Sequence, residues 1–500
     1  MATITPAHRT YERWSLNELS TELIVLILKQ LEEIDPRSLG VARLVSTRFN
    51  IIATPIKYRT IQMTKYIMDP QAETLFPEGI TNIHLHTRHV IVDSDLNAEH
   101  AKRILDKIER LSSISWRYVQ GDLCKGDIWL PSDIIPARHI QSNKVKLYIE
   151  NLPLQDVRNE RHNPYLRAIP TGMLVSLMMA PSTPPLTARV ESVKDLLLHS
   201  PRTEIFWYDD RGQGTRFNFN GNERLPAFKE LSLRSYDWNH SSATVRQHWD
   251  FSKIKHLELI DVPLGPFLSS VPFHDFEELD TLRLDDFSMH VPSRRQDTTR
   301  SQYILIKQIR SLVDLKVTCH TQSFPIDGIL QHAKSLRSLR FRDYTGFTDE
   351  DRCCPTIRLE DLDSMSRQLV NLHTLELDLD ERCCELHPFL FSLCNFRQLH
   401  TLTLHTQTVM NPYEDVDMRI DLDYEKAMQI ISFLVQGKQT ATWRSITIIV
   451  GGWKPIMVRR LSAAWRELHS RGLYAERCFI MEKQESGALV LREEMPIRAS

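Results

Sequence analysis

The residues best suited to bind a metal ion are three histidines and two pairs of adjacent cysteines. His84, His86 and His89 lie within six residues, and His84 and His86 would share one face of a strand. They have no acidic or cysteine ligand close by, which favours surface histidines. Zinc sites usually separate paired cysteines by two or more residues, whereas the pairs at 353–354 and 383–384 are adjacent. We therefore predict no metal site.

Two further segments could support catalysis, and neither has the pattern that catalysis needs. Glu376, Asp378 and Asp380 alternate with leucines, so they are expected on the solvent face of a strand. The segment 437–439 reads Gly-Lys-Gln and lacks the upstream glycine and the Ser/Thr of a phosphate loop. The chain also has no G-x-S-x-G nucleophile motif. We predict no catalytic residue, no cofactor and a protein that is not an enzyme.

The composition is that of an ordinary globular protein. The chain has 500 residues, of which 42% are hydrophobic and 25% charged, with a formal net charge of −2. This balance gives no electrostatic reason to favour nucleic acid or an anionic membrane. The longest clear apolar run, at 23–28, is too short to span a membrane, and residues 1–14 lack the apolar core of a signal peptide. A cytoplasmic or nuclear location is expected.

The elements that could position a binding surface begin with an unusually apolar helix. Residues at every fourth position share one face: Leu19, Leu23, Ile27 and Leu31. The other faces are also apolar: Ile24, Val25, Leu26 and Leu28. A helix that is hydrophobic all round must be buried on all sides, yet a unit of about 45 residues struggles to bury even its own core. The surplus apolar face predicts a partner protein.

Three helices are expected in this first unit. Asn17 or Ser20 can cap the first helix, and Asp35-Pro36 breaks the chain and begins a second. Apolar residues between 38 and 53 have helical spacing, and Thr54-Pro55 should end that segment. The predicted organisation is a flexible N-terminus at 1–14, a three-helix domain at 15–60 and a repeat domain at 61–500.

From residue 61 onward, short strands of the form apolar-x-x-apolar-x-apolar recur between polar loops and helix candidates. The clearest are centred on Leu231, Leu257, Leu282, Leu315, Leu339, Leu375 and Leu402, with Ile446 as a plausible last member. Weaker copies are predicted at 81–86, 112–117 and 144–149, and a helix followed by a Pro-rich turn is predicted for the segment that begins at 173. The shorter spacings match the roughly 20–29 residues of a leucine-rich repeat.

One strand-plus-helix unit cannot bury its apolar face alone, but stacked units can. The expected fold class is therefore α/β: three helices followed by an irregular leucine-rich-repeat-like solenoid, with parallel strands on the concave side and helices on the convex side. A β-sandwich or barrel is disfavoured because helical segments separate almost every pair of strands.

Residues 19–61 resemble an F-box, and the rest resembles the degenerate leucine-rich repeats of fungal-type F-box proteins. The likeness rests on Leu-Ser-Thr-Glu-Leu at 19–23, on Ile27 to Leu31, on Leu39 through Val45-Ser46 with Arg48-Phe49, and on the Tyr-Arg-Thr-Ile exit at 58–61. Two positions depart from the family pattern: Ser20 replaces its proline and Phe49 its common tryptophan. The repeats also lack the asparagine that usually follows each strand.

The resemblance implies docking on the Skp-type adaptor of an SCF (cullin–RING) ubiquitin ligase. One apolar face of the first helix would pack inside the F-box and the other would meet the adaptor. The alternative is that this helix packs against the first repeats. The candidate adaptor-binding residues are Leu19, Glu22, Leu23, Ile27, Leu31, Leu39, Leu44, Val45 and Phe49.

A substrate-binding surface is predicted on the concave side, where the residues beside the strand leucines point away from the core. Its candidate residues are Arg283, Asp285, Arg340, Arg342, Glu376 and Asp378. A groove with a basic strand next to an acidic one could select a charged peptide. The alternative is that these charges neutralise each other across the sheet.

The function expected from the resemblance is substrate recognition by an SCF-type ubiquitin ligase, with an unidentified protein as the substrate. The other hypothesis is a non-degradative interaction scaffold that uses the same repeat surface.

Overall fold

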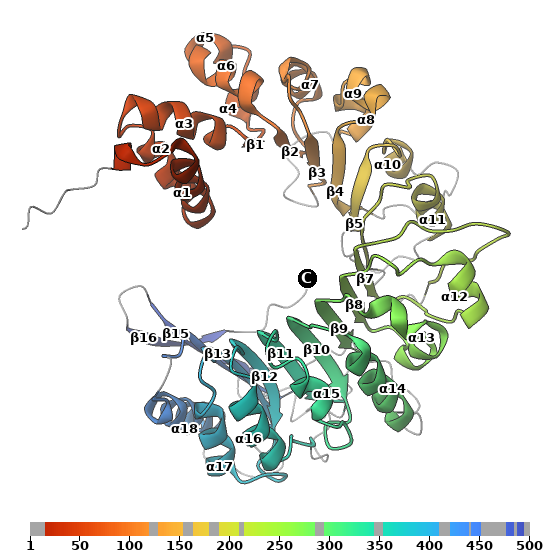
Figure 1. The fold of residues 1–500 in the computed structure, drawn as a ribbon, viewed down its shortest axis with the longest axis vertical. Coiled ribbons are helices and arrows are strands. Elements are labelled where there is room, and N and C mark those ends of the chain that lie inside the picture. The colour runs from red at the N-terminus through yellow and green to blue at the C-terminus, as the bar shows by residue number, and fades with distance from the viewer. Residues whose placement is uncertain are drawn as a thin grey trace, which may run out of the picture. The chain divides into compact units, whose positions relative to one another are not determined.

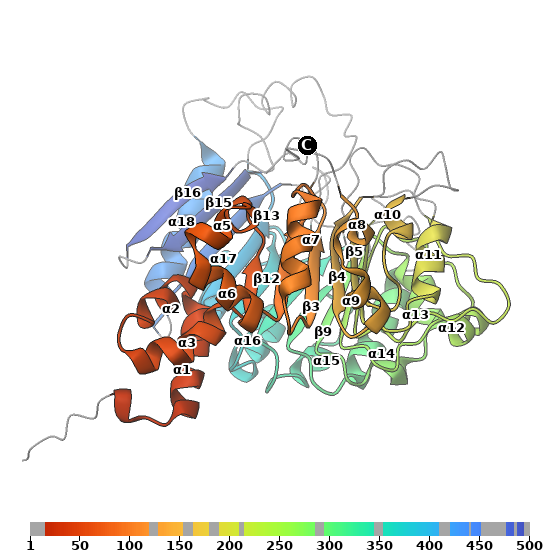
Figure 2. The ribbon, with the colours of Figure 1, turned by 90° about the horizontal axis from the view of Figure 1, so that it is seen from above.

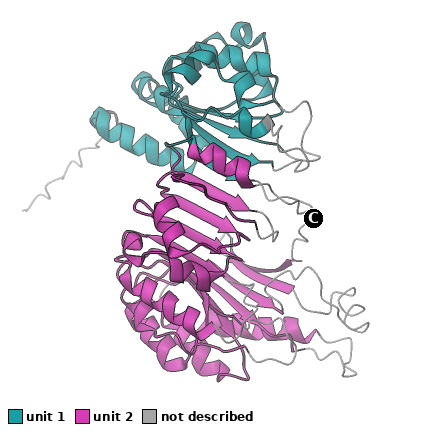
Figure 3. Cartoon of the chain, turned by 90° about the vertical axis from the view of Figure 1, so that its right-hand side faces the viewer, with its two compact units in different colours: residues 1–153, 161–180, 199–202 teal, residues 154–160, 181–198, 203–500 magenta. Residues whose placement is uncertain are grey.

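The structure is a computed structural model in which residues 16–119, 129–153, 164–179, 190–209, 215–285, 295–344, 354–409, 421–439, 442–451, 477–484 and 488–494 are described. The chain divides into two compact units (Figure 3). Unit 1 consists of residues 1–153, 161–180 and 199–202, and unit 2 of residues 154–160, 181–198 and 203–500. Within the described ranges, no helix is both long and apolar enough to cross a bilayer.

Unit 1 begins with three α-helices, drawn in red in Figure 2. They are α1 (Thr21–Ile34), α2 (Pro36–Ala42) and α3 (Thr47–Lys57), preceded by the single turn η1 (Leu16–Glu18). The Ser20 hydroxyl accepts a hydrogen bond from the Leu23 N–H (3.4 Å), and the Asp35 carboxylate accepts one from the Arg37 N–H (3.0 Å). The predicted cap at Ser20 and helix start at Asp35-Pro36 are confirmed.

The prediction of helical structure from residue 38 to 53 was wrong in its detail. The chain turns between α2 and α3, and Ser46 caps the new helix by accepting from the Phe49 N–H (3.2 Å). Helix α3 also continues past Pro55 to Lys57. Pro55 has no backbone N–H, so α3 lacks the hydrogen bond that this residue would otherwise donate. The predicted boundary between residues 60 and 61 falls inside unit 1, at the start of the first strand.

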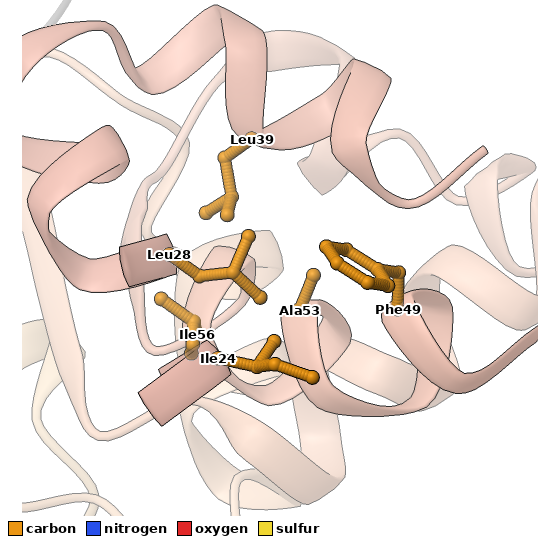
Figure 4. Close-up of a cluster of buried hydrophobic side chains, with 6 residues drawn as sticks. All are labelled: Ile24, Leu28, Leu39, Phe49, Ala53 and Ile56. Carbon is orange, nitrogen blue, oxygen red and sulfur yellow. The ribbon is translucent and has the colours of Figure 1, made fainter. Parts of the chain in front are cut away.

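The three helices enclose a small apolar core (Figure 4). Its members are each at most 7% exposed: Ile24, Leu28, Leu39, Phe49, Ala53 and Ile56. The Arg48 guanidinium donates a hydrogen bond to the Leu19 carbonyl (2.7 Å) and so ties α3 to the start of α1. Ile24 and Leu28 lie one turn apart, so the core uses only one face of α1.

Unit 1 continues as a parallel sheet in chain order. Its strands are β1 (Thr60–Gln62), β2 (His89–Asp93), β3 (Ser113–Arg117), β4 (Lys146–Leu152) and β5 (Leu174–Met179). The helices between them are α4 (Lys65–Met68), α5 (Ala72–Leu75), α6 (Pro77–His86), α7 (Ala98–Lys107), α8 (Pro131–Ile134), α9 (Ala137–Ser142) and α10 (Pro164–Arg167). Buried residues Ile61, Val90, Ile114 and Leu147 stand in register across β1 to β4.

Unit 2 repeats the same arrangement over more strands. Its parallel strands are β6 (Ile205–Asp209), β7 (Glu230–Arg234), β8 (His256–Ile260), β9 (Thr281–Asp285), β10 (Asp314–Cys319), β11 (Ser338–Asp343), β12 (Thr374–Leu379), β13 (Thr401–Thr406) and β14 (Ser445–Val450). Two antiparallel strands, β15 (Arg477–Lys483) and β16 (Leu489–Glu494), follow.

The helices of unit 2 lie along the outer side of its strands (Figure 1). They are α11 (Val190–Leu198), α12 (Ser242–His248), α13 (Leu264–Ser270), α14 (Arg295–Gln308), α15 (Asp327–Leu330), α16 (Leu359–Gln368), α17 (Leu386–Cys394) and α18 (Leu422–Gly437), with the turn η4 (Phe273–Phe276). The eight predicted repeat positions form one ladder in which every residue is at most 1% exposed: Leu231, Leu257, Leu282, Leu315, Leu339, Leu375, Leu402 and Ile446. The predicted stacking of strand-and-helix repeats is confirmed within this unit.

Two secondary-structure predictions in unit 1 were wrong. The segment 81–86 is the end of helix α6, which Pro77 begins and which buries Ile80 and Ile83 one turn apart. Residues 174–179, predicted as helix, form β5. That strand is buried almost throughout, and a strand covered on both faces reads as an unbroken apolar run rather than an alternating one.

We predict that Leu28→Ala lowers the stability of the three-helix unit by about 2–5 kcal/mol, because the substitution leaves a cavity in its core. Leu26→Ala, on the exposed side of the same helix, should change stability by less than about 0.5 kcal/mol. Native-state hydrogen exchange of the α1 amides measures both effects separately from the repeats. Equal losses of protection in the two variants would mean that the two faces of α1 contribute equally to stability, which would contradict the prediction.

Candidate functional site

The exposed side of α1 is apolar. Leu23, Leu26 and Ile27 are 49%, 59% and 47% exposed, whereas Ile24 and Leu28 on the opposite side are 1% exposed. Residues three or four positions apart share a helix face, so the three exposed side chains form one stripe. The helix therefore has two apolar sides, and the three-helix unit covers only one of them.

The α2–α3 region adds further exposed apolar side chains. Val41, Leu44 and Val45 are 65%, 84% and 63% exposed. We call these three residues, together with Leu23, Leu26 and Ile27, the apolar docking set. Leu26 and Val41 were not among the predicted adaptor-binding residues. Whether such a residue is exposed or part of the core depends on where the helices begin and turn. The residue types alone do not reveal this.

The remaining predicted adaptor-binding residues are less accessible. Leu39 and Phe49 were predicted to bind the adaptor, but they are buried in the core of the unit, which corrects that prediction. Leu19 and Leu31 are partly buried and pack against that core. Glu22 is exposed in the first turn of α1, where its own backbone N–H and the Ser20 hydroxyl lower the pKa of its carboxyl. It is therefore a fixed negative charge beside the stripe.

The six predicted substrate-binding residues lie on strands β9, β11 and β12 and bind mainly one another. Arg340 contacts Asp285 at 2.5 Å and Glu376 at 3.0 Å. Arg342 contacts Asp378 at 2.5 Å, and Arg283 contacts Asp285 at 2.8 Å. We call these six residues the strand charge network.

Burial divides the strand charge network into two halves. The side chains of Arg283, Arg340 and Glu376 keep 25%, 11% and 26% of their surface exposed. Arg342, Asp285 and Asp378 are buried, which corrects their prediction as surface contacts. The physical reason is that the last residues of these strands are covered on both faces, so charges placed there must pair internally.

A histidine that the sequence did not single out completes the network. His405 on β13 is buried, and its Nε2 lies 2.8 Å from Glu376 Oε1. Burial lowers the pKa of His405 to about 4, and the charge of Arg342 acts in the same direction. Burial by itself would raise the pKa of Glu376, but the His405 hydrogen bond and the Arg340 charge outweigh it and hold this pKa at about 2. At neutral pH a neutral imidazole therefore donates to a carboxylate.

Buried aspartates accept hydrogen bonds from backbone N–H groups at the end of a strand or in the segment that follows it. Asp378 accepts a hydrogen bond from the Asp343 N–H (2.8 Å), and Asp380 accepts one from the Cys354 N–H (2.8 Å). Asp343 accepts from the Thr321 N–H (2.9 Å). Carboxylates thus satisfy backbone donors in repeats that have no asparagine after the strand.

The histidines and cysteines considered as metal ligands in the sequence do not form a metal-binding group among the described residues. His84 and His86 belong to helix α6, so they do not share a strand face as predicted. Cys353 lies outside the described residues. Across the described ranges, no group of three or more His, Cys, Asp or Glu is placed to hold a metal ion.

No protein-family model matches the chain, and no curated relative does either. Among solved structures, it is similar to the leucine-rich repeat-containing protein LegL7 from Legionella pneumophila. That likeness has 12% identity, covers 76% of this chain and 99% of LegL7, and has a TM-score of 0.25. At this TM-score it carries no argument, and the repeat architecture rests on the strand register of the chain itself.

We predict that Arg342→Met destabilises unit 2 by about 3–5 kcal/mol, because it leaves the Asp378 carboxylate buried without its cation. Arg342→Met combined with Asp378→Leu should recover part of this loss. Arg310→Ala, which removes exposed ion pairs with Glu277 and Glu278, should cost less than about 1 kcal/mol. Urea denaturation measures all three, and a loss for Arg342→Met no larger than for Arg310→Ala would contradict the prediction.

We also predict a specific loss of stability in acid. The folded pKa values of His405 and Glu376 lie below the ordinary 6.5 and 4.5, so both groups contribute stability above those values. The contribution is lost as the pH falls from 6.5 toward about 4 for His405 and from 4.5 toward about 2 for Glu376. Each fully shifted group gives a slope of about 1.4 kcal/mol per pH unit.

The variant His405→Gln isolates the upper window, because glutamine can still donate to Glu376 but does not titrate. The free energy of unfolding from urea titrations should fall less steeply between pH 6.5 and 4 in this variant than in the wild type. Parallel curves would show that His405 does not titrate in that window.

Proposed function

We propose that this protein is the substrate-recognition subunit of an SCF (cullin–RING) ubiquitin ligase and is not itself an enzyme. Its three-helix unit docks on a Skp-type adaptor as an F-box, and its repeats hold a target protein for ubiquitin transfer by other subunits. The observation that carries the proposal is the apolar docking set, placed on a three-helix unit whose sequence at residues 19–61 resembles an F-box.

The exposure of this set favours a partner over internal packing. Leu23 and Ile27 keep about half of their surface exposed in unit 1, which also contains the first repeats. Large apolar side chains gathered on one face are usually covered by another protein. This supports adaptor docking over the alternative in which the same face of α1 packs against the first repeats.

The repeats supply the target-binding side of the proposal. Stacked strands present extended surfaces that suit protein binding. The accessible half of the strand charge network, together with neighbouring Glu258 and Lys316, places both signs of charge along that surface. Rim charges of this kind select partners and set association rates more than they add affinity.

Co-purification with the Skp-type adaptor tests the docking step. Replacing Leu23 and Ile27 together with Asp places two charges in the proposed interface, and recovery of the adaptor should fall at least about thirtyfold, as for loss of a binding hot spot. The matched control is Ile304→Asp with Val313→Asp, because these apolar residues of unit 2 are 41% and 37% exposed. The control should bind normally.

Equal recovery of the adaptor by the wild type and the Leu23/Ile27 variant, or recovery by neither, would reject docking through this face. The target side is tested by affinity purification with the proteasome blocked. Bound proteins that accumulate under the block indicate a degradative role, whereas partners of unchanged abundance would indicate an interaction scaffold.

A further inference from the structure

A basic pocket of about 390 Å³ lies within unit 1, lined by residues of α1, α3 and the end of α6 and by residues that precede the first strands. Its eight lining residues include no Asp or Glu. Five of them are basic: Lys29, His86, Arg59, Arg88 and Arg110. The chain as a whole has a formal net charge of −2, so this concentration of positive charge is local.

The fold brings these cations together by strand register. Arg59 directly precedes β1 and Arg88 directly precedes β2, and the Arg59 carbonyl accepts a hydrogen bond from the Arg88 N–H (2.9 Å). The Arg88 carbonyl accepts in turn from the N–H of Ser112, two residues beyond Arg110 (2.7 Å). Adjacent strands are about 4.8 Å apart, so the three arginines lie close together near the N-terminal ends of β1, β2 and β3. Lys29 joins them from α1.

The four Lys and Arg side chains have no acidic partner among the described residues. Other basic residues of the same unit do: Lys107 contacts Glu73 at 2.6 Å, and Arg117 contacts Glu150 at 2.9 Å. The positive field reaches neighbouring groups, since burial together with the charges of Arg59 and Arg88 lowers the pKa of His89. Unneutralised cations that line one pocket repel each other and attract anions.

We propose that this pocket binds a polyphosphorylated anion through Arg59, Arg88, Arg110 and Lys29. The planar guanidinium fork matches phosphate oxygens bidentately, and three such forks with an ammonium group suit a ligand with several phosphate groups. The volume lies within the roughly 300–1,000 Å³ of small-ligand sites. A free polyphosphate and a polyphosphorylated lipid headgroup present the same chemistry.

Isothermal titration calorimetry of the full chain with inorganic triphosphate tests the proposal. Binding should weaken as salt is added, because the attraction is screened. Arg59→Ala with Arg88→Ala should lower the affinity at least about thirtyfold, since each removes a charge-assisted hydrogen bond. Lys29→Ala, on the exposed side of α1, should lower it less.

The control is Arg337→Ala with Arg444→Ala. These exposed arginines directly precede β11 and β14, just as Arg59 and Arg88 directly precede β1 and β2. They lie outside the pocket. The control should bind triphosphate like the wild type, and circular dichroism should give unchanged melting for every variant. An equal loss in both double variants would overturn the site.

Flotation with phosphatidylcholine vesicles, with and without phosphatidylinositol bisphosphate, separates the two sources. Vesicle binding that requires the phosphorylated lipid, and that triphosphate displaces, identifies a headgroup ligand. Triphosphate binding without vesicle binding identifies a free anion. If the folded chain binds neither probe, the proposal is wrong. The adaptor is absent from these assays, so their outcome is independent of the docking test.

Discussion

The structure depends on the in-register burial of one leucine-type residue per repeat. In unit 2 the ladder from Leu231 to Ile446 runs through eight consecutive strands, and no member of it is more than 1% exposed. A single strand and its helix could not exclude water from such a residue; the neighbouring repeats on both sides are needed. Strand order, helix placement and the alignment of residues that precede the strands all follow from that requirement.

The same requirement explains what the sequence could and could not predict. The ladder residues were predictable because leucines at fixed offsets indicate a buried strand face. Strand β5 was missed because burial on both faces removes the alternation, and the segment 81–86 misled because its apolar residues fit both periods. Helix caps at Ser20 and Asp35 were predictable, since capping depends on local residue types.

The candidate surfaces divide in a similar way. That α1 carries more apolar surface than a small unit can bury was evident from composition, but which residues form the core depended on the packing of α2 and α3. The strand charge network shows the converse. Alternation placed Arg342 and Asp378 beside the leucines correctly, yet it could not show that these strand ends are covered. His405 was invisible to sequence reasoning because its role is set by Glu376 on the neighbouring strand.

The antiparallel hairpin of β15 and β16 forms the last two strands of the sheet. The last strand of an open sheet has a row of backbone N–H and C=O groups without a partner strand. A strand of another chain could pair with them. Here β15 pairs antiparallel with β14, and β16 pairs antiparallel with β15. Strand β16 is largely exposed and carries Arg492, Glu493 and Glu494. Charges along an outer strand make pairing with a further strand unfavourable. We therefore expect this hairpin to hinder edge-to-edge pairing between copies of the chain.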